Sequence, residues 1–158
     1  MDGAVHARQI AIPDDVGQHT TLQRPDYHDA FSVPPGALAG LPAEAVLRRV
    51  LEQSRPALRR FVRTGWRFGL GFPLAPFPAP GHVLGWPISA STPQAVTGDQ
   101  RSRLLTVQLV LHTSDHAVVF ATFVRYEHPA ASVLWAAAGP LHRRIVPALP
   151  RDAARGHR

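Results

Sequence analysis

This chain of 158 residues contains no cysteine and no lysine. The absence of cysteine excludes disulfide bonds, thiolate metal ligands and a cysteine nucleophile. Long hydrophobic runs are missing too, since no stretch approaches the roughly 18 apolar residues that a membrane-spanning helix needs. Residues 1–20 contain aspartates but no apolar segment of the kind found in secretory signals. We therefore expect a cytoplasmic protein without a membrane partner.

The basic residues are all arginine, and 17 of them against 11 acidic residues give a formal net charge of +6. A positive charge can indicate nucleic-acid binding, but here arginine replaces lysine throughout a chain that is also rich in alanine, proline and glycine. That composition is typical of GC-rich genomes such as those of actinobacteria. Seven arginines lie within residues 48–67, where the solvated face of a helix is the ordinary explanation, and no nucleic-acid motif accompanies them. We expect no nucleic-acid partner.

Size and composition indicate one globular domain. A chain of this length can bury a sizeable core without cross-links, and 45% apolar with 18% charged residues fits an ordinary folded protein. Residues 1–24 lack hydrophobic periodicity and predict a flexible N-terminal arm. Residues 25–150 predict the single domain, and residues 151–158 predict a disordered tail.

Two short helices are predicted directly after a first strand. Residues 26–33 alternate in polarity, which is typical of a strand. Pro42 suits the first position of a helix, and Pro56 ends that helix and begins a second one. Residues 69–80 contain four prolines and predict an apolar loop, which either covers the core or lines the mouth of a pocket.

The remaining chain predicts strands followed by a single long helix. Residues 83–88 and 94–97 predict short strands, and residues 104–112 and 116–126 predict an antiparallel hairpin. Both faces of the last strand are largely apolar, so we expect it to lie centrally and to be covered on both sides. The hydrophobic spacing then changes to three or four, which predicts an amphipathic helix with a kink at Pro140. This order favours an α+β fold in which an antiparallel sheet wraps around the last helix, with room for a small apolar ligand.

Four side chains are candidates for chemistry. Tyr27 and Asp29 share one face of the first strand and could supply acid–base groups, although Asp29 could equally bond a neighbouring backbone or Arg125. His142 follows Trp135 by two helical turns, so it could act as a general acid or base beside an apolar wall. The alternative for this histidine is a half-buried ring bonded to the sheet. Arg125 interrupts an apolar strand. Three alternatives are open for it: a pair with an acidic side chain, a contact with an anionic ligand group, or exposure to solvent.

Metal and cofactor motifs are weak or missing in the sequence. His112 and His116 are four residues apart across a turn, and zinc would need Asp115 or a distant histidine as a third ligand. The sequence also contains no phosphate-binding glycine loop, nucleophile elbow or dinucleotide-binding fingerprint. We therefore expect neither a metal nor a cofactor.

Three segments of the chain carry a resemblance to a known family. They are Asp26–Phe31 (DYHDAF), Thr122–Arg125 (TFVR) and residues 134–146, with LW at the start and GPLHRRIV at the end. These segments resemble the DUF2867 family of the START/Bet v 1-like (SRPBCC) superfamily, and the likeness spans roughly residues 25–155. The resemblance implies a helix-grip fold, in which a curved antiparallel sheet of six or seven strands wraps around a long C-terminal helix.

The resemblance also suggests a function. Helix-grip proteins include polyketide cyclases and aromatases, lipid carriers and ligand-gated regulators. We expect a cyclase-like enzyme of secondary metabolism that binds a hydrophobic small molecule, with His142, Tyr27 or Asp29 moving protons and Arg125 steadying an enolate. The alternative is a carrier that binds an apolar metabolite or lipid without turnover, and a homodimer is left open. The residues expected to line the pocket are Trp86, Phe120, Thr122, Leu134 and Trp135.

Overall fold

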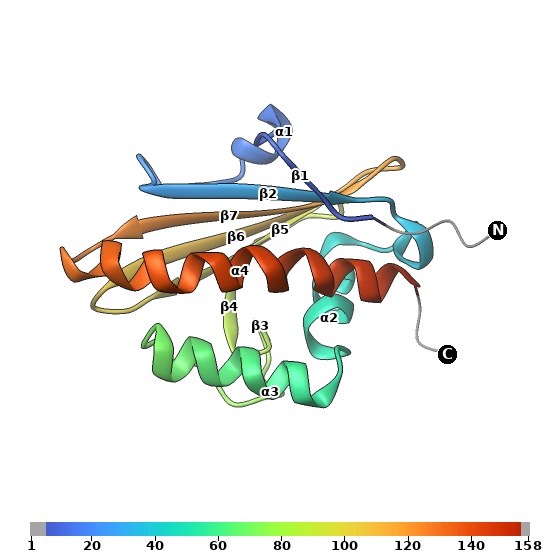
Figure 1. Cartoon of the computed structure of the whole chain (residues 1–158). Helices are drawn as coiled ribbons and strands as arrows, with labels where there is room; N and C mark the ends of the chain where they lie inside the picture. Colours follow the sequence, from blue (N-terminus) through green and yellow to red (C-terminus); the bar gives the residue numbers. More distant parts are fainter. Residues whose placement is uncertain (1–5, 156–158) are drawn as a thin grey trace.

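The structure, a computed structural model, describes the backbone of residues 6–155 and the side chains of residues 6–153. Seven strands and four α-helices make up the fold, with short 3-10 and π-helical turns between them (Figure 1). The strands are β1 (Arg8–Ile10), β2 (Tyr27–Val33), β3 (His82–Val83), β4 (Trp86–Ser91), β5 (Ala95–Arg101), β6 (Leu105–Thr113) and β7 (Val118–Tyr126). The helical elements are α1 (Asp14–Gly17), η1 (Gly36–Leu38), α2 (Ala43–Glu52), α3 (Pro56–Thr64), the π-helical η2 (Gly65–Gly69) and α4 (Ala130–Arg155).

All seven strands form one curved antiparallel sheet in the order β1-β2-β7-β6-β5-β4-β3. The expected hairpin is confirmed, since β6 and β7 pair along their full lengths. The strand β2 pairs with β7 although most of the chain separates them, and this register places Asp29 opposite Thr122. The central position of β7 is also confirmed, because it lies between β2 and β6 and its apolar side chains are buried on both faces.

The long helix α4 lies along one face of the sheet, and α3 lies on the side of α4 that is remote from the sheet (Figure 1). The two predicted short helices are confirmed as α2 and α3, and Pro56 occupies the first turn of α3. The helix α2 buries a stripe of aliphatic side chains in the core between sheet and helices. The helix α4 continues past Pro140, Pro147 and Pro150, and the kink expected at Pro140 stays a prediction. Within residues 6–155, no helix has both the length and the apolar character needed to cross a membrane.

The opposite face of the sheet is covered by the N-terminal segment, for which we expected a flexible arm. In the structure β1 pairs with β2, and Val16 of α1 is fully buried in a second core against strand residues such as Phe123. The apolar outer face of β7 needs a cover, and this segment provides it. At the other end, α4 extends through Arg155 into the expected tail, whereas residues 1–5 and 156–158 lie outside the described part.

Two strands differ from their predicted limits. The expected strand at residues 83–88 is interrupted by a turn at Leu84 and Gly85, which have positive φ angles of 49° and 90°. The strand β5 continues to Arg101 through polar residues that we expected to end it. Its Asp99 accepts a hydrogen bond of 2.7 Å from Gln108 Nε2 on the neighbouring strand. Cross-strand bonding therefore supports β5 beyond the predicted end at residue 97.

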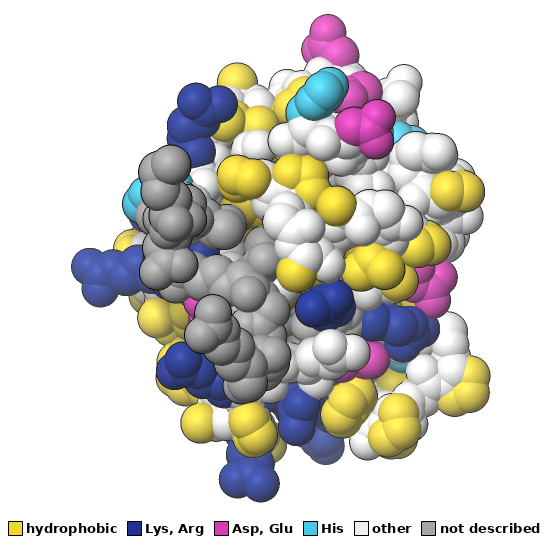
Figure 2. Space-filling model, turned by 90° about the vertical axis from the view of Figure 1, so that its right-hand side faces the viewer, with side chains coloured by type: hydrophobic (Ala, Val, Ile, Leu, Met, Phe, Trp, Pro, Cys, Tyr) yellow, Lys and Arg dark blue, Asp and Glu magenta, His cyan; other side chains and the backbone are white. Residues whose placement is uncertain are grey.

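Arginine side chains gather over the helical half of the molecule in Figure 2, whereas several acidic side chains lie near α1 at the opposite side. Many of these arginines have contacts within the fold. Arg48 forms ion pairs of 3.0 and 3.2 Å with Glu44 and Glu52. Arg63 donates hydrogen bonds to the carbonyl oxygens of Leu84 and Ala75 and so joins α3 to the β3–β4 turn and the proline-rich loop. These contacts give part of the arginine cluster a structural role.

Candidate functional site

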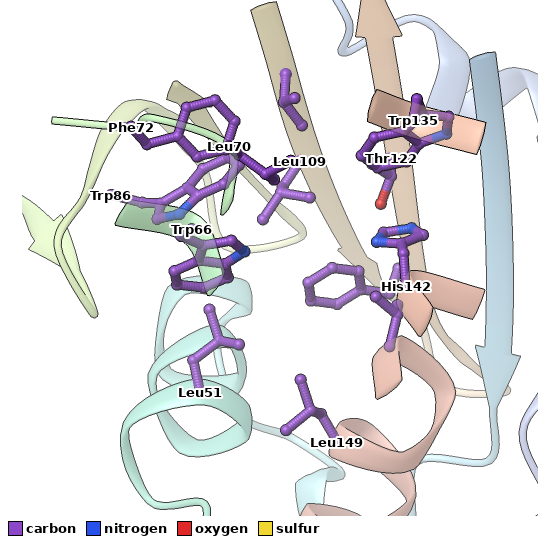
Figure 3. Close-up of a pocket in the computed structure, with 13 residues that line it drawn as sticks. Leu51, Trp66, Leu70, Phe72, Trp86, Leu109, Thr122, Trp135, His142 and Leu149 are labelled. Carbon is purple, nitrogen blue, oxygen red and sulfur yellow. The ribbon is translucent and has the colours of Figure 1, made fainter. Parts of the chain in front are cut away.

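A small cavity of about 50 Å³ lies between the sheet and the helical layer, and we call it the inner cavity (Figure 3). Aromatic and aliphatic side chains from β4, β6, β7, α2, η2 and α4 form its walls. Because the hydrophobic faces of the sheet and of α4 meet here, the surroundings are of low polarity. The lining residues are Leu51, Trp66, Leu70, Phe72, Trp86, Val107, Leu109, Phe120, Thr122, Trp135, His142, Val146 and Leu149.

A larger hollow of about 230 Å³ lies between α3 and η2 on one side and α4 on the other, and we call it the outer groove. Leu134 lines this groove rather than the inner cavity, and the side chains of Phe61 and Leu141 there are 52% and 47% exposed. The two spaces adjoin, because six residues line both of them. These shared residues are Trp66, Leu70, Trp135, His142, Val146 and Leu149.

The proline-rich loop forms part of the wall of the inner cavity. Phe72 is 2% exposed and packs edge-to-face on Trp86, with ring centroids 5.6 Å apart. Trp66 also packs on Trp86, with ring centroids 5.2 Å apart. Sequence reasoning missed Trp66, although its position four residues after the buried Val62 was an available helical signal. The loop therefore both covers the core and lines the cavity.

A polar cluster stands on the α4 side of the inner cavity. The Tyr27 hydroxyl donates a hydrogen bond of 2.5 Å to Asp29 Oδ2, and His142 Nε2 lies 3.0 Å from the same oxygen. The carboxylate of Asp29 is fully buried. The histidine contact is close but does not have hydrogen-bond alignment, because the oxygen lies off the direction of the ring N–H. Helix placement thus brings His142 to the two residues that the sequence already placed together on one strand face.

Tyr27 supports this cluster as a hydrogen-bond donor. Burial is the main reason why its pKa is raised to about 12, and the bond to Asp29 raises the pKa further while Arg143 opposes the shift. The phenol therefore keeps its proton at neutral pH. Its ring packs against Trp135 and His142, with centroid distances of 5.2 and 6.3 Å. Tyr27 is not among the cavity-lining residues, so its geometry suits positioning of Asp29 and His142 better than contact with a ligand.

Several buried polar atoms around the cavity have no hydrogen-bond partner among the described residues. Buried polar groups are bonded in the great majority of cases, because an unpaired one costs about 1–3 kcal/mol. A group of such atoms beside one apolar cavity is therefore unusual and marks a place where a ligand could supply the missing bonds. The atoms are Asp29 Oδ1, Trp86 Nε1, Thr122 Oγ1, Trp135 Nε1 and His142 Nε2.

Arg125 is the one proposed catalytic residue that the structure does not bring to this cluster. It alternates with Thr122 and Val124 along β7 and therefore faces away from α4. Its guanidinium forms an ion pair of 2.8 Å with Glu127. The Thr106 hydroxyl and Arg125 hold the pKa of Glu127 below its usual value. The arginine thus has an acidic partner near the strand end, but this partner is not Asp29.

The histidines considered for metal binding lie elsewhere. His112 Nε2 is 4.0 Å from Asp15 Oδ2 of α1, and its ring is 6.0 Å from that of His19. In the part of the chain that the structure describes, no group of three or more histidine, cysteine, aspartate or glutamate residues is placed to hold a metal ion.

Comparisons of the chain with known protein families, with curated proteins and with solved structures found no match. The family resemblance in the sequence therefore stays a prediction. The geometry of the inner cavity and the outer groove is the main guide to function.

Proposed function

We propose that this protein is a helix-grip domain of the START/Bet v 1-like superfamily that binds an apolar small molecule in the cytoplasm. Two features support the fold assignment. The six strands β2-β7-β6-β5-β4-β3 form a curved sheet, with two helices inserted after its first strand. The final helix then lies along the sheet (Figure 1), as the resemblance to the DUF2867 family implies. Apolar walls with a few polar groups are typical of small-molecule sites.

We further propose that the site catalyses acid–base chemistry on a carbonyl compound, as a polyketide cyclase does. The observation that carries this proposal is His142 at the cavity wall with the buried Asp29 carboxylate 3.0 Å behind it. A carboxylate beside an imidazole balances the charge that the ring gains when it takes a proton during the reaction. Such a pair needs neither a metal nor a cofactor.

The reaction would be an intramolecular aldol closure. His142 removes a proton from the carbon beside one carbonyl, and the resulting enolate carbon attacks a second carbonyl to form a carbon–carbon bond. The proton then passes from His142 to the new alkoxide, and loss of water gives the enone. The apolar walls hold the flexible chain in a reactive conformation, which lowers the entropic part of the barrier. Since Arg125 is remote, the Thr122 hydroxyl, which lies beside His142, is the donor that we assign to the enolate oxygen.

A cyclisation assay tests this proposal directly. The probe is a linear alkyl-tailed diketone whose carbonyls are separated by three methylene groups, and the conjugated product is followed by ultraviolet absorbance. We expect the native protein to accelerate closure and His142→Gln to lower the rate about a hundredfold or more, as loss of a general base does. The matched control is His112→Gln, which changes a histidine on the opposite side of the sheet and should keep the native rate. Equal rates in both variants would contradict the role of His142.

A carrier that binds without turnover is the second candidate. One observation favours it: His142 is the single titratable side chain among the residues that line the two spaces. A site with so little polar chemistry is well suited to holding an apolar molecule. Saturable binding of the diketone with no acceleration of its closure, in the native protein, would favour the carrier over the enzyme.

A further inference from the structure

The two spaces differ in chemistry, and that difference identifies the class of ligand. We propose that the ligand is a hydrocarbon chain with an uncharged carbonyl or hydroxyl head, which lies in the inner cavity against Thr122 and His142. The hydrocarbon body then occupies the outer groove. This inference rests on the proposed binding function and goes beyond it by assigning the head group, its charge and its orientation.

The inner cavity presents a pair of hydrogen-bonding groups. Thr122 is 1% exposed, its hydroxyl has no partner among the described residues, and a hydroxyl can both donate and accept. In Figure 3 the Thr122 oxygen points toward the His142 ring. His142 directs Nε2 toward Asp29, and neither ring nitrogen has a hydrogen bond within residues 6–153. An oxygen placed between the two side chains would therefore satisfy the buried Thr122 hydroxyl and lie against the His142 ring.

The charges around this pair select against an anionic head. Asp29 supplies a buried negative charge directly behind His142, so a protonated His142 already has its counter-ion. No arginine occurs among the residues that line the inner cavity or the outer groove. A carboxylate in the inner cavity would lose its hydration without gaining a cation of its own, and such a loss is expensive in apolar surroundings.

The sizes of the two spaces and their exposure to solvent indicate which end of the ligand lies in which space. The outer groove is the larger space, at about 230 Å³ against about 50 Å³ for the inner cavity. It is lined by Leu134, Ala138 and Ile145 of α4 and is open to solvent beside Phe61 and Leu141. A bulky apolar body therefore fits the groove, whereas the small polar-sided cavity fits a single head group. The rings of Trp66 and Trp135 lie where the two spaces adjoin.

The unpaired Thr122 hydroxyl also predicts a trade-off between stability and recognition. Thr122→Val keeps the side-chain shape but removes a buried polar group that has no partner in the free protein. We expect a raised Tm, because the desolvation cost of the hydroxyl disappears. The matched control Thr106→Val removes a hydroxyl that is bonded to Glu127 and should lower Tm. A structural role for Thr122 would instead give a lowered Tm in both variants.

Binding of matched ten-carbon probes tests the head group. All three tryptophans of the chain line the inner cavity, so intrinsic fluorescence reports binding. The probes are decanol, methyl octyl ketone, decane and decanoate, titrated into the full-length protein. We expect decanol and the ketone to bind at least about fivefold more tightly than decane or decanoate, as expected for a hydrogen bond worth about 1 kcal/mol. This preference should disappear in Thr122→Val and remain in Thr106→Val.

The alternative outcomes separate the two proposals. If all four probes bind equally, the apolar site stands and the head-group assignment is overturned. Tighter binding of decanoate than of decanol would likewise overturn the assignment and would indicate an anion site. If no probe changes the fluorescence up to its solubility limit, the proposed binding function fails together with this inference.

Discussion

The two faces of the sheet differ in whether a buried polar side chain has hydrogen-bond partners. On the face covered by the N-terminal segment, Gln108 is 4% exposed and every hydrogen-bonding group of its amide is paired. Its Oε1 accepts bonds of 2.6 and 2.8 Å from the Thr20 hydroxyl and the Thr21 N–H. Its Nε2 donates bonds of 3.0 and 2.7 Å to Thr21 Oγ1 and Asp99 Oδ1. On the face covered by α4, Thr122 is equally buried and its hydroxyl is unpaired.

This contrast distinguishes a closed core from a site. Gln108 has partners from the arm and from β5, so its amide helps to hold the arm in place. Thr122 and His142 line the inner cavity and leave hydrogen-bonding capacity unused, and so does Asp29 behind His142. A fold tolerates that cost only where the rest of the structure compensates, and functional sites are where such costs concentrate. The face covered by α4 is therefore where a ligand is expected.

The largest expected effect comes from shortening a phenylalanine on the closed face. Phe123 is 4% exposed within the core beneath the arm, and Phe123→Ala should lower the free energy of unfolding by about 3–5 kcal/mol. Phe120→Ala, on the other face, enlarges the inner cavity. We expect decanol to stabilise Phe123→Ala only as much as it stabilises the native protein, because the site is unchanged there. It should stabilise Phe120→Ala more, because decanol also fills the space that the missing ring leaves in the inner cavity. Denaturant unfolding with and without decanol measures the stability of each variant. Equal stabilisation of the two variants by decanol would contradict the distinction between the faces.

A smaller effect is expected from removing the paired amide. Gln108→Leu keeps an apolar stem but leaves Thr20, Thr21 and Asp99 without their partner, so it should cost about 1–3 kcal/mol. The sign is opposite to that expected for Thr122→Val. Limited proteolysis of Gln108→Leu should also show faster cleavage within residues 8–24, because the amide anchors this segment. Unchanged cleavage would mean that β1 and the second core alone hold the arm.

A pH dependence should distinguish Tyr27 from other groups. Its pKa is about 12 in the folded protein, against 10.0 for a free tyrosine. The folded state therefore holds its proton more tightly, and this contribution is complete below pH 10 and is lost as pH rises toward 12. Tyr126 is the second tyrosine, and burial also raises its pKa. Ultraviolet titration of tyrosinate in Tyr126→Phe isolates Tyr27, and a midpoint near 10 there would contradict both the burial of the phenol and its bond to Asp29.

The smallest effect is expected at Arg125. Its ion pair with Glu127 is partly exposed, and such pairs contribute at most about 1 kcal/mol. Arg125→Gln should therefore change the free energy of unfolding by no more than that and should leave decanol binding at its native affinity. Loss of binding in this variant would return Arg125 to the site and would contradict the placement of its side chain.

Local patterns predicted most of the elements and the sharing of one strand face by Tyr27 and Asp29. They also separated Thr122 from Arg125 by alternation, although they left the direction of Arg125 open. Sequence patterns gave wrong predictions where a contact with a residue far away in the chain determined the local structure. Asp99 continues a strand because Gln108 bonds it, and α1 is ordered against the sheet because the outer face of β7 is apolar.

The sequence by itself determined the α+β class, the hairpin of β6 and β7 and the long helix α4, because alternation and helical spacing act between near neighbours in the chain. The tertiary structure decided the site. Pairing of β2 with β7 places Asp29 opposite Thr122, and the position of α4 brings His142 within 3.0 Å of Asp29. These contacts join residues that are far apart in sequence. Their formation depends on sheet register and helix packing, for which a periodic pattern carries no information.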